Sequence, residues 1–190
     1  MTQTKAPSAQ SGFTLIETMI AIAILSIGVV TLIAAFGTTV GATQHAEENL
    51  IAREKALQAL ESVYAARNDQ QITFAQIANI SNGGIFTDGP VTLLCAGPDG
   101  LVNTADDINC PASGPCVAGP ECVVLPGPDG ILGTPDDVAM SLSNFRRQIQ
   151  ISAVPGYQTL NQVVVTITYT QGGTTPTQAY VVDSLVSAYR

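Results

Sequence analysis

A long uncharged stretch dominates the N-terminal quarter of the chain. No Asp, Glu, Lys or Arg occurs between Thr18 and Gln44. Because roughly 20 apolar residues in a helix are enough to span a bilayer, this stretch predicts a helix that can lie in a membrane. Glu17 stands at its start, where a carboxylate at the edge of hydrocarbon costs on the order of a few kcal/mol unless it is paired. The pattern therefore indicates a specific partner for Glu17.

Beyond the uncharged stretch, the pattern becomes that of a helix with one apolar side. Leu50, Leu57, Leu60 and Tyr64 recur at spacings of seven, three and four, and no proline lies between them. This periodicity predicts that the same helix continues to about Arg67 with one face on a core.

The last quarter of the chain has the pattern of a β-sheet. Segments 145–154, 162–170 and 178–189 are rich in β-branched and aromatic residues, and Pro155-Gly156 and Gly172-Gly173 separate them. Such segments between turn residues predict at least three antiparallel strands. The chain is thus expected to be α+β, with a long N-terminal helix, apolar and then amphipathic, packed on a small C-terminal antiparallel sheet.

The residues at the start of the apolar stretch carry a resemblance to a known family. A short polar leader with one basic residue, Lys5, ends in the segment GFTLIE at 12–17. This N-terminus resembles that of type IV prepilins, the family of pilins and type II secretion pseudopilins. The resemblance implies that a prepilin peptidase cleaves between Gly12 and Phe13, and that the new amine of Phe13 is methylated to N-methylphenylalanine. It further implies an assembly role for Glu17, whose carboxylate neutralises the N-terminal amine of a neighbouring subunit.

Two simpler explanations of the N-terminus fit less well. A secretory signal has a basic n-region and an apolar stretch of about 7–15 residues, whereas this leader has one basic residue and a longer apolar run. A generic single-pass anchor requires neither Glu17 nor the Gly12-Phe13 junction.

The prepilin resemblance also implies a domain organisation of the lollipop type found in pilins. It predicts a cleaved leader at 1–12, a transmembrane or fibre-core helix at 13–40 and an amphipathic continuation of this helix at 41–67. A globular head is expected at 68–190. Within the head, a Gly/Pro/Asp/Cys-rich variable loop is expected at 81–140 and the sheet at 145–190.

Charge and residue counts exclude several functions. The chain has 7 Lys and Arg against 15 Asp and Glu, which argues against direct nucleic-acid binding through a basic patch. Arg146-Arg147 is interpreted as a solvated strand face. The single histidine, His45, cannot form a catalytic triad or a zinc cluster, so no enzymatic activity is expected.

Four cysteines fall within one Gly/Pro-rich stretch that the prepilin reading places on the exported side of the membrane. Cys95, Cys110, Cys116 and Cys122 are expected to form two disulfides there. Three pairings are possible, and Cys95–Cys110 with Cys116–Cys122 closes the two shortest non-overlapping loops. The spacing lacks the close ligand pairs of structural zinc sites.

The same stretch contains an eleven-residue motif twice, as GPDGLVNTADD at 97–107 and GPDGILGTPDD at 127–137, with seven identical positions. Oxygen ligands on a Gly-rich loop are what Ca²⁺ requires, although neither copy matches the EF-hand pattern. The alternative is that Pro-Asp-Gly forms plain turns whose aspartates bond nearby amides. The candidate calcium ligands are Asp99, Asn103, Asp106, Asp107, Asp129, Asp136 and Asp137. No other cofactor is expected.

These expectations lead to a structural subunit, a minor pilin of a type IV pilus. The C-terminal segment FRRQIQISAV…NQVVVTITYT resembles that of PilV-type minor pilins, and the apolar helix lacks the proline of many major pilins. The expected location is the bacterial inner membrane as a single-pass protein with a periplasmic head, and afterwards the pilus fibre at the cell surface. Expected partners are other pilin or pseudopilin subunits, the prepilin peptidase, and an inner-membrane assembly platform with a separate motor ATPase. A type II secretion pseudopilin, and a membrane-anchored adhesin or DNA-uptake pilin, are the alternatives.

Overall fold

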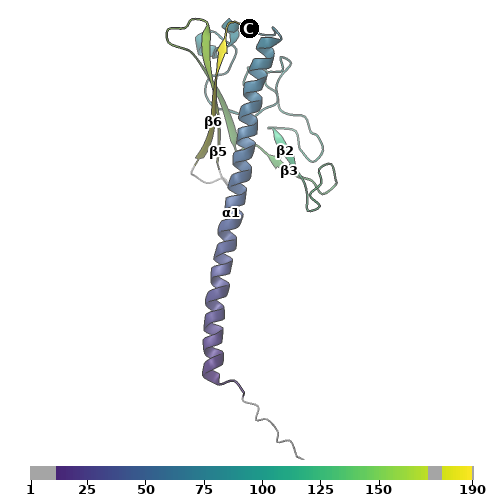
Figure 1. The fold of residues 1–190 in the computed structure, drawn as a ribbon. Coiled ribbons are helices and arrows are strands. Elements are labelled where there is room, and N and C mark those ends of the chain that lie inside the picture. The colour runs from purple at the N-terminus through teal and green to yellow at the C-terminus, as the bar shows by residue number, and fades with distance from the viewer. Residues whose placement is uncertain (1–11, 171–176, 190) are drawn as a thin grey trace, which may run out of the picture. The chain divides into compact units, whose positions relative to one another are not determined.

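The computed structural model describes residues 12–170 and 177–189, and it has the expected α+β architecture (Figure 1). The chain divides into two compact units, Met1–His45 and Ala46–Arg190, which are described separately below. The elements in chain order are helix α1 (Leu15–Asn68), the 3-10 helices η1 (Phe74–Gln76) and η2 (Ile80–Asn82), and strands β1 (Val91–Thr92), β2 (Cys122–Leu125), β3 (Val138–Ser141), β4 (Phe145–Ala153), β5 (Leu160–Thr170) and β6 (Thr177–Ser187).

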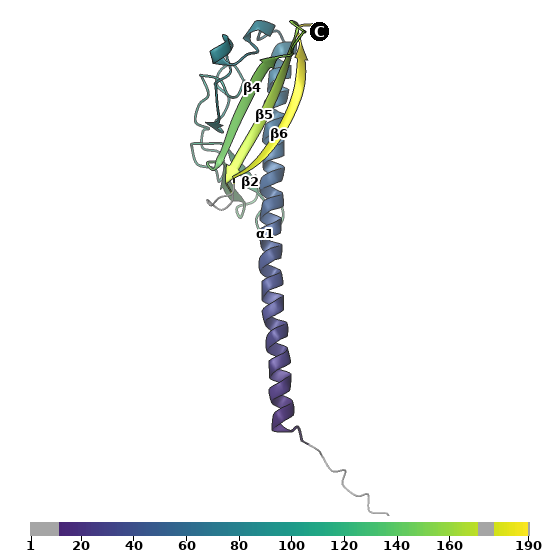
Figure 2. The same ribbon diagram turned by 90° about the vertical axis from the view of Figure 1, so that its left-hand side faces the viewer.

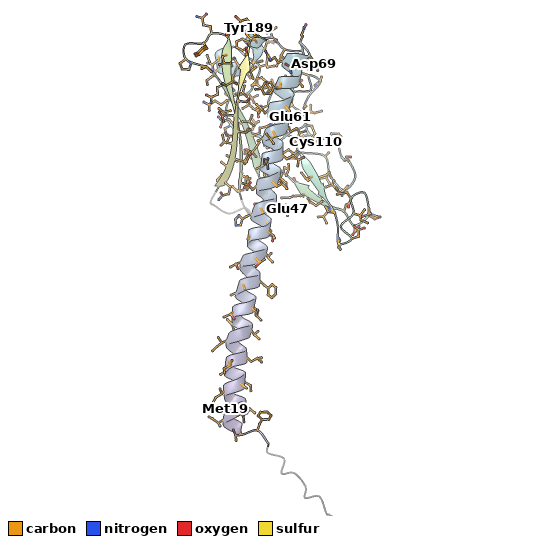
Figure 3. The ribbon with its side chains drawn as sticks, in the orientation of Figure 1. Met19, Glu47, Glu61, Asp69, Cys110 and Tyr189 are labelled. Atoms are coloured by element: carbon orange, nitrogen blue, oxygen red, sulfur yellow. A yellow bond between two sulfur atoms is a disulfide. The ribbon has the colours of Figure 1, made fainter. Side chains whose placement is uncertain are left out.

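The first unit consists of the N-terminal part of α1. Its side chains project outward around the helix and are exposed almost throughout (Figure 3). The few hydroxyls bond back to the helix itself, as when Ser26 donates to the carbonyl of Ile22 at 2.7 Å and Thr31 donates to that of Gly28 at 2.8 Å. Each hydroxyl is thereby satisfied without water, as hydrocarbon requires. By length and composition, α1 is long and apolar enough to cross a membrane.

In the second unit, the C-terminal part of α1 packs through a stripe of small residues rather than leucines. Of the four positions that the periodicity singled out, Leu60 is buried and Leu57 and Tyr64 are partly buried, whereas Leu50 is exposed. The buried residues of α1 are Ile51, Ala52, Ala56, Ala59, Leu60, Val63 and Ala66.

The main sheet has four antiparallel strands in the order β1-β4-β5-β6, with β4, β5 and β6 corresponding to the three predicted strands (Figure 2). Alternate residues of β4 and β5 face the core, where Ile149 pairs with Val165 and Phe145 stacks on Tyr169. The first predicted turn is present, with Gly156 at φ +84°. The second, Gly172-Gly173, lies outside the described residues.

The stretch between helix and sheet adds a two-stranded sheet, β2-β3, that the sequence did not predict. Two disulfides, Cys95–Cys110 and Cys116–Cys122, hold this region. They are the pairing that closes the two shortest loops. No cysteine of the chain is left free.

Candidate functional site

The start of α1 brings together the residues that the sequence singled out. The helix begins at Leu15, and Thr14 caps it: the amide of Glu17 donates to the hydroxyl of Thr14 at 3.3 Å and to its carbonyl at 3.1 Å. Thr followed three positions later by Glu is a recognised helix-start pattern, and it was a signal the sequence analysis did not use. Glu17 also lies in the first turn, where the helix dipole favours a negative charge.

Gly12 and Phe13 lie immediately before the helix in a non-helical segment, and both are exposed. A peptide bond in such a segment is accessible to a peptidase, whereas one inside the helix is not. Glu17 follows four residues after Phe13 and forms no ion pair with any cationic group in the described part of the chain. The arrangement leaves both the junction and the carboxylate open to other molecules.

Comparison with known protein families matches residues 7–33 to the prokaryotic N-terminal methylation motif. The chain carries the class III signal of the type IV pilin family. The match spans the Gly12-Phe13 junction, Glu17 and the first part of the apolar helix. No curated protein and no solved structure matches the chain at a significant level.

The matched motif has general implications for proteins that carry it. Proteins with this signal are structural, and the signal implies other pilin subunits as partners and processing by a prepilin peptidase. The apolar helix and the signal together are consistent with membrane anchoring. The motif is shared by pilins and pseudopilins and does not distinguish the two.

The two acidic repeats, far from the matched motif, fold into loops of similar geometry. The carboxylate of Asp99 accepts a bond from the amide of Leu101 at 2.8 Å, and Asp129 accepts one from Ile131 at 2.8 Å. Later in each repeat, the backbone amide of Asn103 donates to the carboxylate of Asp107 at 2.8 Å. The equivalent amide of Gly133 donates to the carboxylate of Asp137 at 2.7 Å. The identical aspartates of the motif therefore organise the loop backbone.

Glycine is required at the first position of each repeat. A Cβ atom on Gly97 would lie 2.3 Å from the backbone oxygen of Asp106, and one on Gly127 would lie 2.2 Å from that of Asp136. These distances are far below van der Waals contact, so no larger residue fits without a backbone shift. Gly100 and Gly130 also share a positive φ, at +71° and +70°. The identical positions of the motif thus have the same structural cause in both copies.

The carboxylates of the repeats accept hydrogen bonds from donors within their own loops. Hydrogen bonds from the Thr104 and Thr134 hydroxyls hold the pKa values of Asp106 and Asp136 below the ordinary value, while burial raises the pKa of Asp107. Among the residues that the structure describes, no group of three or more His, Cys, Asp or Glu side chains is arranged to hold a metal ion. This geometry is that of plain turns, and calcium binding at the candidate ligands stays a prediction.

Arg147 corrects one interpretation from the sequence. Whereas Arg146 is exposed and donates to the hydroxyl of Thr92, Arg147 is only 1% exposed. Its guanidinium donates to Glu121 at 3.1 Å and lies 3.8 Å from Asp107. Alternate residues of a strand face the same side of the sheet, and Arg147 lies two residues from both Phe145 and Ile149, which are buried. Its side chain therefore faces inward. It is therefore unavailable for DNA, and the pair is not a solvated face.

The buried cluster around Arg147 ties three segments together. Glu121 also forms an ion pair with Lys55 of α1, at 2.7 Å between Nζ and Oε2. Asp107, which lies near the guanidinium of Arg147, belongs to the first repeat. A helix, a strand and the first loop thus meet at one set of charges. Because buried charges require partners, each member holds the others in place.

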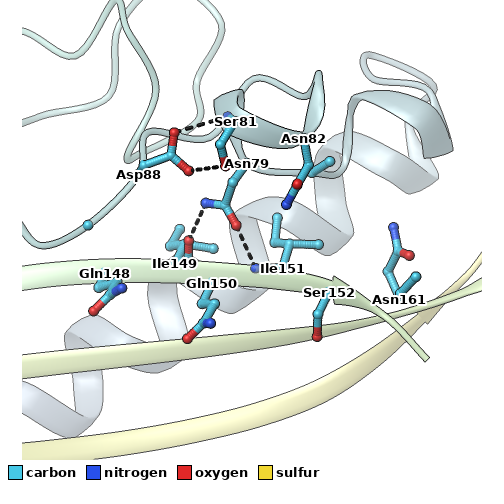
Figure 4. A pocket seen from close by; sticks show the side chains of 13 residues that line it. Asn79, Ser81, Asn82, Asp88, Gln148, Ile149, Gln150, Ile151, Ser152 and Asn161 are labelled. Carbon is cyan, nitrogen blue, oxygen red and sulfur yellow. Dashed lines mark hydrogen bonds between the residues drawn. The ribbon is translucent and has the colours of Figure 1, made fainter. Parts of the chain in front are cut away.

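A polar cavity of about 570 Å³ lies along the edge of β4 (Figure 4). Strand β1 pairs with β4 only at Arg146 and Arg147, so in the described part of the chain no strand borders the rest of this edge. The side chain of Asn79 partly takes the place of a neighbouring strand. Its Nδ2 donates to the carbonyl of Ile149 and its Oδ1 accepts from the amide of Ile151, both at 2.8 Å.

The remaining lining of the cavity is rich in amides and hydroxyls. Asp88 accepts bonds from the backbone and hydroxyl of Ser81, while Gln148, Gln150 and Ser152 project from β4 (Figure 4). Amide and hydroxyl groups both donate and accept hydrogen bonds. The cavity therefore suits a polar, uncharged ligand.

Proposed function

We propose that the protein is a minor pilin, a structural subunit that moves from the bacterial inner membrane into a type IV pilus. The observation that carries the proposal is the Gly12-Phe13 junction followed by Glu17 at the mouth of a helix that is uncharged from Thr18 to Gln44. Before assembly the helix anchors the chain with its head in the periplasm. Afterwards the same apolar surface is buried against other subunits.

In this proposal, prepilin peptidase cleaves after Gly12 and the amine of Phe13 becomes methylated. The carboxylate of Glu17 then pairs with the Phe13 amine of a neighbouring subunit. Support comes from the exposure of both groups and from the absence of an ion pair to Glu17 in the described part of the chain. An inner-membrane platform and a separate motor ATPase supply the machinery and the energy of assembly.

Mass spectrometry of the N-terminal peptide tests the proposal. The protein is recovered from fibres sheared off the cell surface and from washed inner membranes. Methylated Phe13 in the sheared fibres is the expected result. The same processed terminus found only in membranes would favour the pseudopilin of a type II secretion system, and an intact leader in both fractions would refute processing altogether.

The amide-lined cavity favours a second candidate function, that of a surface adhesin. Its donors and acceptors are amides and hydroxyls apart from the carboxylate of Asp88, as a glycan requires, and Gln150 is exposed at its edge. Binding of isolated fibres to a glycan array, lost on Gln150→Ala while fibre yield is unchanged, would support this function. Binding that survives the substitution would argue against it. Direct DNA uptake is disfavoured by the burial of Arg147 and the acidic net charge.

A further inference from the structure

The two repeats have the same loop geometry but opposite surroundings. In the first repeat the apolar pair Leu101 and Val102 is 1% and 9% exposed, within the core of the second unit. In the second repeat the equivalent pair, Ile131 and Leu132, is 60% and 61% exposed. Several hydrogen bonds within the two loops correspond, including those that Asp99 and Asp129 accept and those that Asp107 and Asp137 accept from residues 103 and 133. The loops differ at Thr104 and Thr134, because only the hydroxyl of Thr104 also bonds the last aspartate of its repeat.

The first repeat shows how such a loop docks. Besides inserting its apolar pair, it exchanges bonds with Thr87, whose amide donates to the carbonyl of Asn103 at 2.8 Å and whose hydroxyl accepts from the Asn103 side chain at 2.8 Å. Its last aspartate, Asp107, lies 3.8 Å from the guanidinium of Arg147. The surface that receives the loop therefore offers an apolar hollow next to an arginine.

The second repeat has the same groups without that surface. It lies between β2 and β3, and Figure 1 shows this hairpin extending away from the four-stranded sheet. Asp137 is the counterpart of Asp107, and its Oδ2 accepts the amide of Gly133 as the Oδ2 of Asp107 accepts that of Asn103. The Oδ2 of Asp107 also lies beside Arg147, whereas Asp137 forms no ion pair with any cation in the described part of the chain. Apolar side chains at the tip of a hairpin, next to a carboxylate without a cation, are what an undocked copy of the first repeat would present.

We propose that the second repeat, residues 127–137, docks onto the head of a neighbouring pilin-type subunit. Ile131 and Leu132 enter an apolar hollow there, and Asp137 pairs with an arginine or lysine at its edge. The chemistry of the receiving surface is taken from the first repeat, which meets an apolar hollow and Arg147 in its own chain. The docking rests on the proposed function as a fibre subunit, because that function supplies the neighbour.

Site-specific photo-crosslinking in cells that assemble the fibre tests the docking. The crosslinking residue p-benzoylphenylalanine replaces Leu132 in the full chain. Two matched positions serve as controls: Tyr157, which is 64% exposed in the β4–β5 turn, and Ile27, which is exposed on α1 and reports helix packing in the fibre. The expected result is a crosslink from position 132 to another pilin-type subunit, at a peptide that contains apolar residues and an arginine or lysine.

A second variant separates recognition from chance proximity. Asp137→Asn removes the charge but keeps an oxygen that can accept the amide of Gly133, so the loop geometry is retained. The crosslink from position 132 should fall about tenfold in this variant, while the crosslink from position 27 is unchanged.

The docking would be overturned if position 27 crosslinks to other subunits while position 132 crosslinks no more than the control position 157. The fibre function would then still stand. A crosslink from 132 that Asp137→Asn does not weaken would also overturn the docking and leave the fibre function standing. Absence of subunit crosslinks from both 27 and 132 would overturn the fibre function, and the docking with it.

Discussion

Replacing Arg147 by methionine tests whether the buried ion cluster holds the head together. The substitution keeps a long apolar side chain but removes the guanidinium, which bonds Glu121 at 3.1 Å and the carbonyl of Leu94 at 3.3 Å and lies 3.8 Å from Asp107. Both carboxylates are then left in the interior, since their side chains are only 10% and 7% exposed. Breaking a buried pair in this way costs about 3–5 kcal/mol.

The measurement is equilibrium unfolding of the full chain in detergent with its disulfides intact, followed by fluorescence of its tyrosines. Arg147→Met should lower the free energy of unfolding by about 3–5 kcal/mol. The matched control is Arg146→Met, one residue away and exposed, which should cost less than about 1 kcal/mol. Equal stability of the two variants would refute the view that the cluster joins the first repeat, β4 and α1.

Four further predictions concern the helix start and the repeats. Glu17→Leu should leave membrane insertion intact but lower incorporation into sheared fibres about tenfold, as measured by immunoblot, because the neighbouring amine loses its partner; normal incorporation would contradict the pairing. Gly97→Ala should destabilise the head by about 1–3 kcal/mol in thermal unfolding, whereas Gly127→Ala should increase hydrogen exchange only in the exposed hairpin. The pKa of Asp136 is lowered in the folded state, so ionised Asp136 stabilises the second loop above the ordinary pKa of 3.8, and this stabilisation is lost as pH falls through the lowered pKa. Thr134→Val should move the loss to higher pH in an NMR titration of Asp136. An unchanged titration would disprove the hydrogen bond from the Thr134 hydroxyl. If calcium binds the repeats, free Ca²⁺ at about 100 times its Kd should stabilise the head by about 2.7 kcal/mol, and no shift in the melting temperature up to about 10 mM would favour plain turns.

The parts of the fold that the sequence predicted are those that local pattern determines. The uncharged helix and the strands β4, β5 and β6 depend on residues close together in the chain. The sequence predicted two disulfides but left three pairings possible, and the folded chain shows which one forms. The alanines in the buried stripe of α1 were not predicted from the sequence, although Ala52, Ala56 and Ala59 recur at spacings of four and three, as residues on one helix face do. The wrong interpretation of Arg147 has a similar origin, since its strand parity with Phe145 and Ile149 was already visible in the sequence.

Other features depend on tertiary contacts and gave no local signal. Strand β1 is two residues long, and its pairing with β4 follows only from the folded chain. Two nearly identical repeats likewise gave no indication that one would be buried and the other exposed. Local sequence determines the loop, while the surrounding chain determines its environment.

The start of α1 shows how much of the cost of Glu17 the chain offsets by itself. A carboxylate at the edge of hydrocarbon costs on the order of a few kcal/mol. The first helical turn, capped by Thr14, returns about 0.3–1 kcal/mol through the helix dipole. No cation in the described part of the chain pairs with Glu17. In the proposed assembly, a neighbouring subunit would meet the remaining cost. A protonated amine is a suitable partner, and N-methylation of Phe13 would leave that positive charge in place. If the proposed pairing forms, Glu17 costs less in the fibre than in an isolated chain, and this difference would favour assembly.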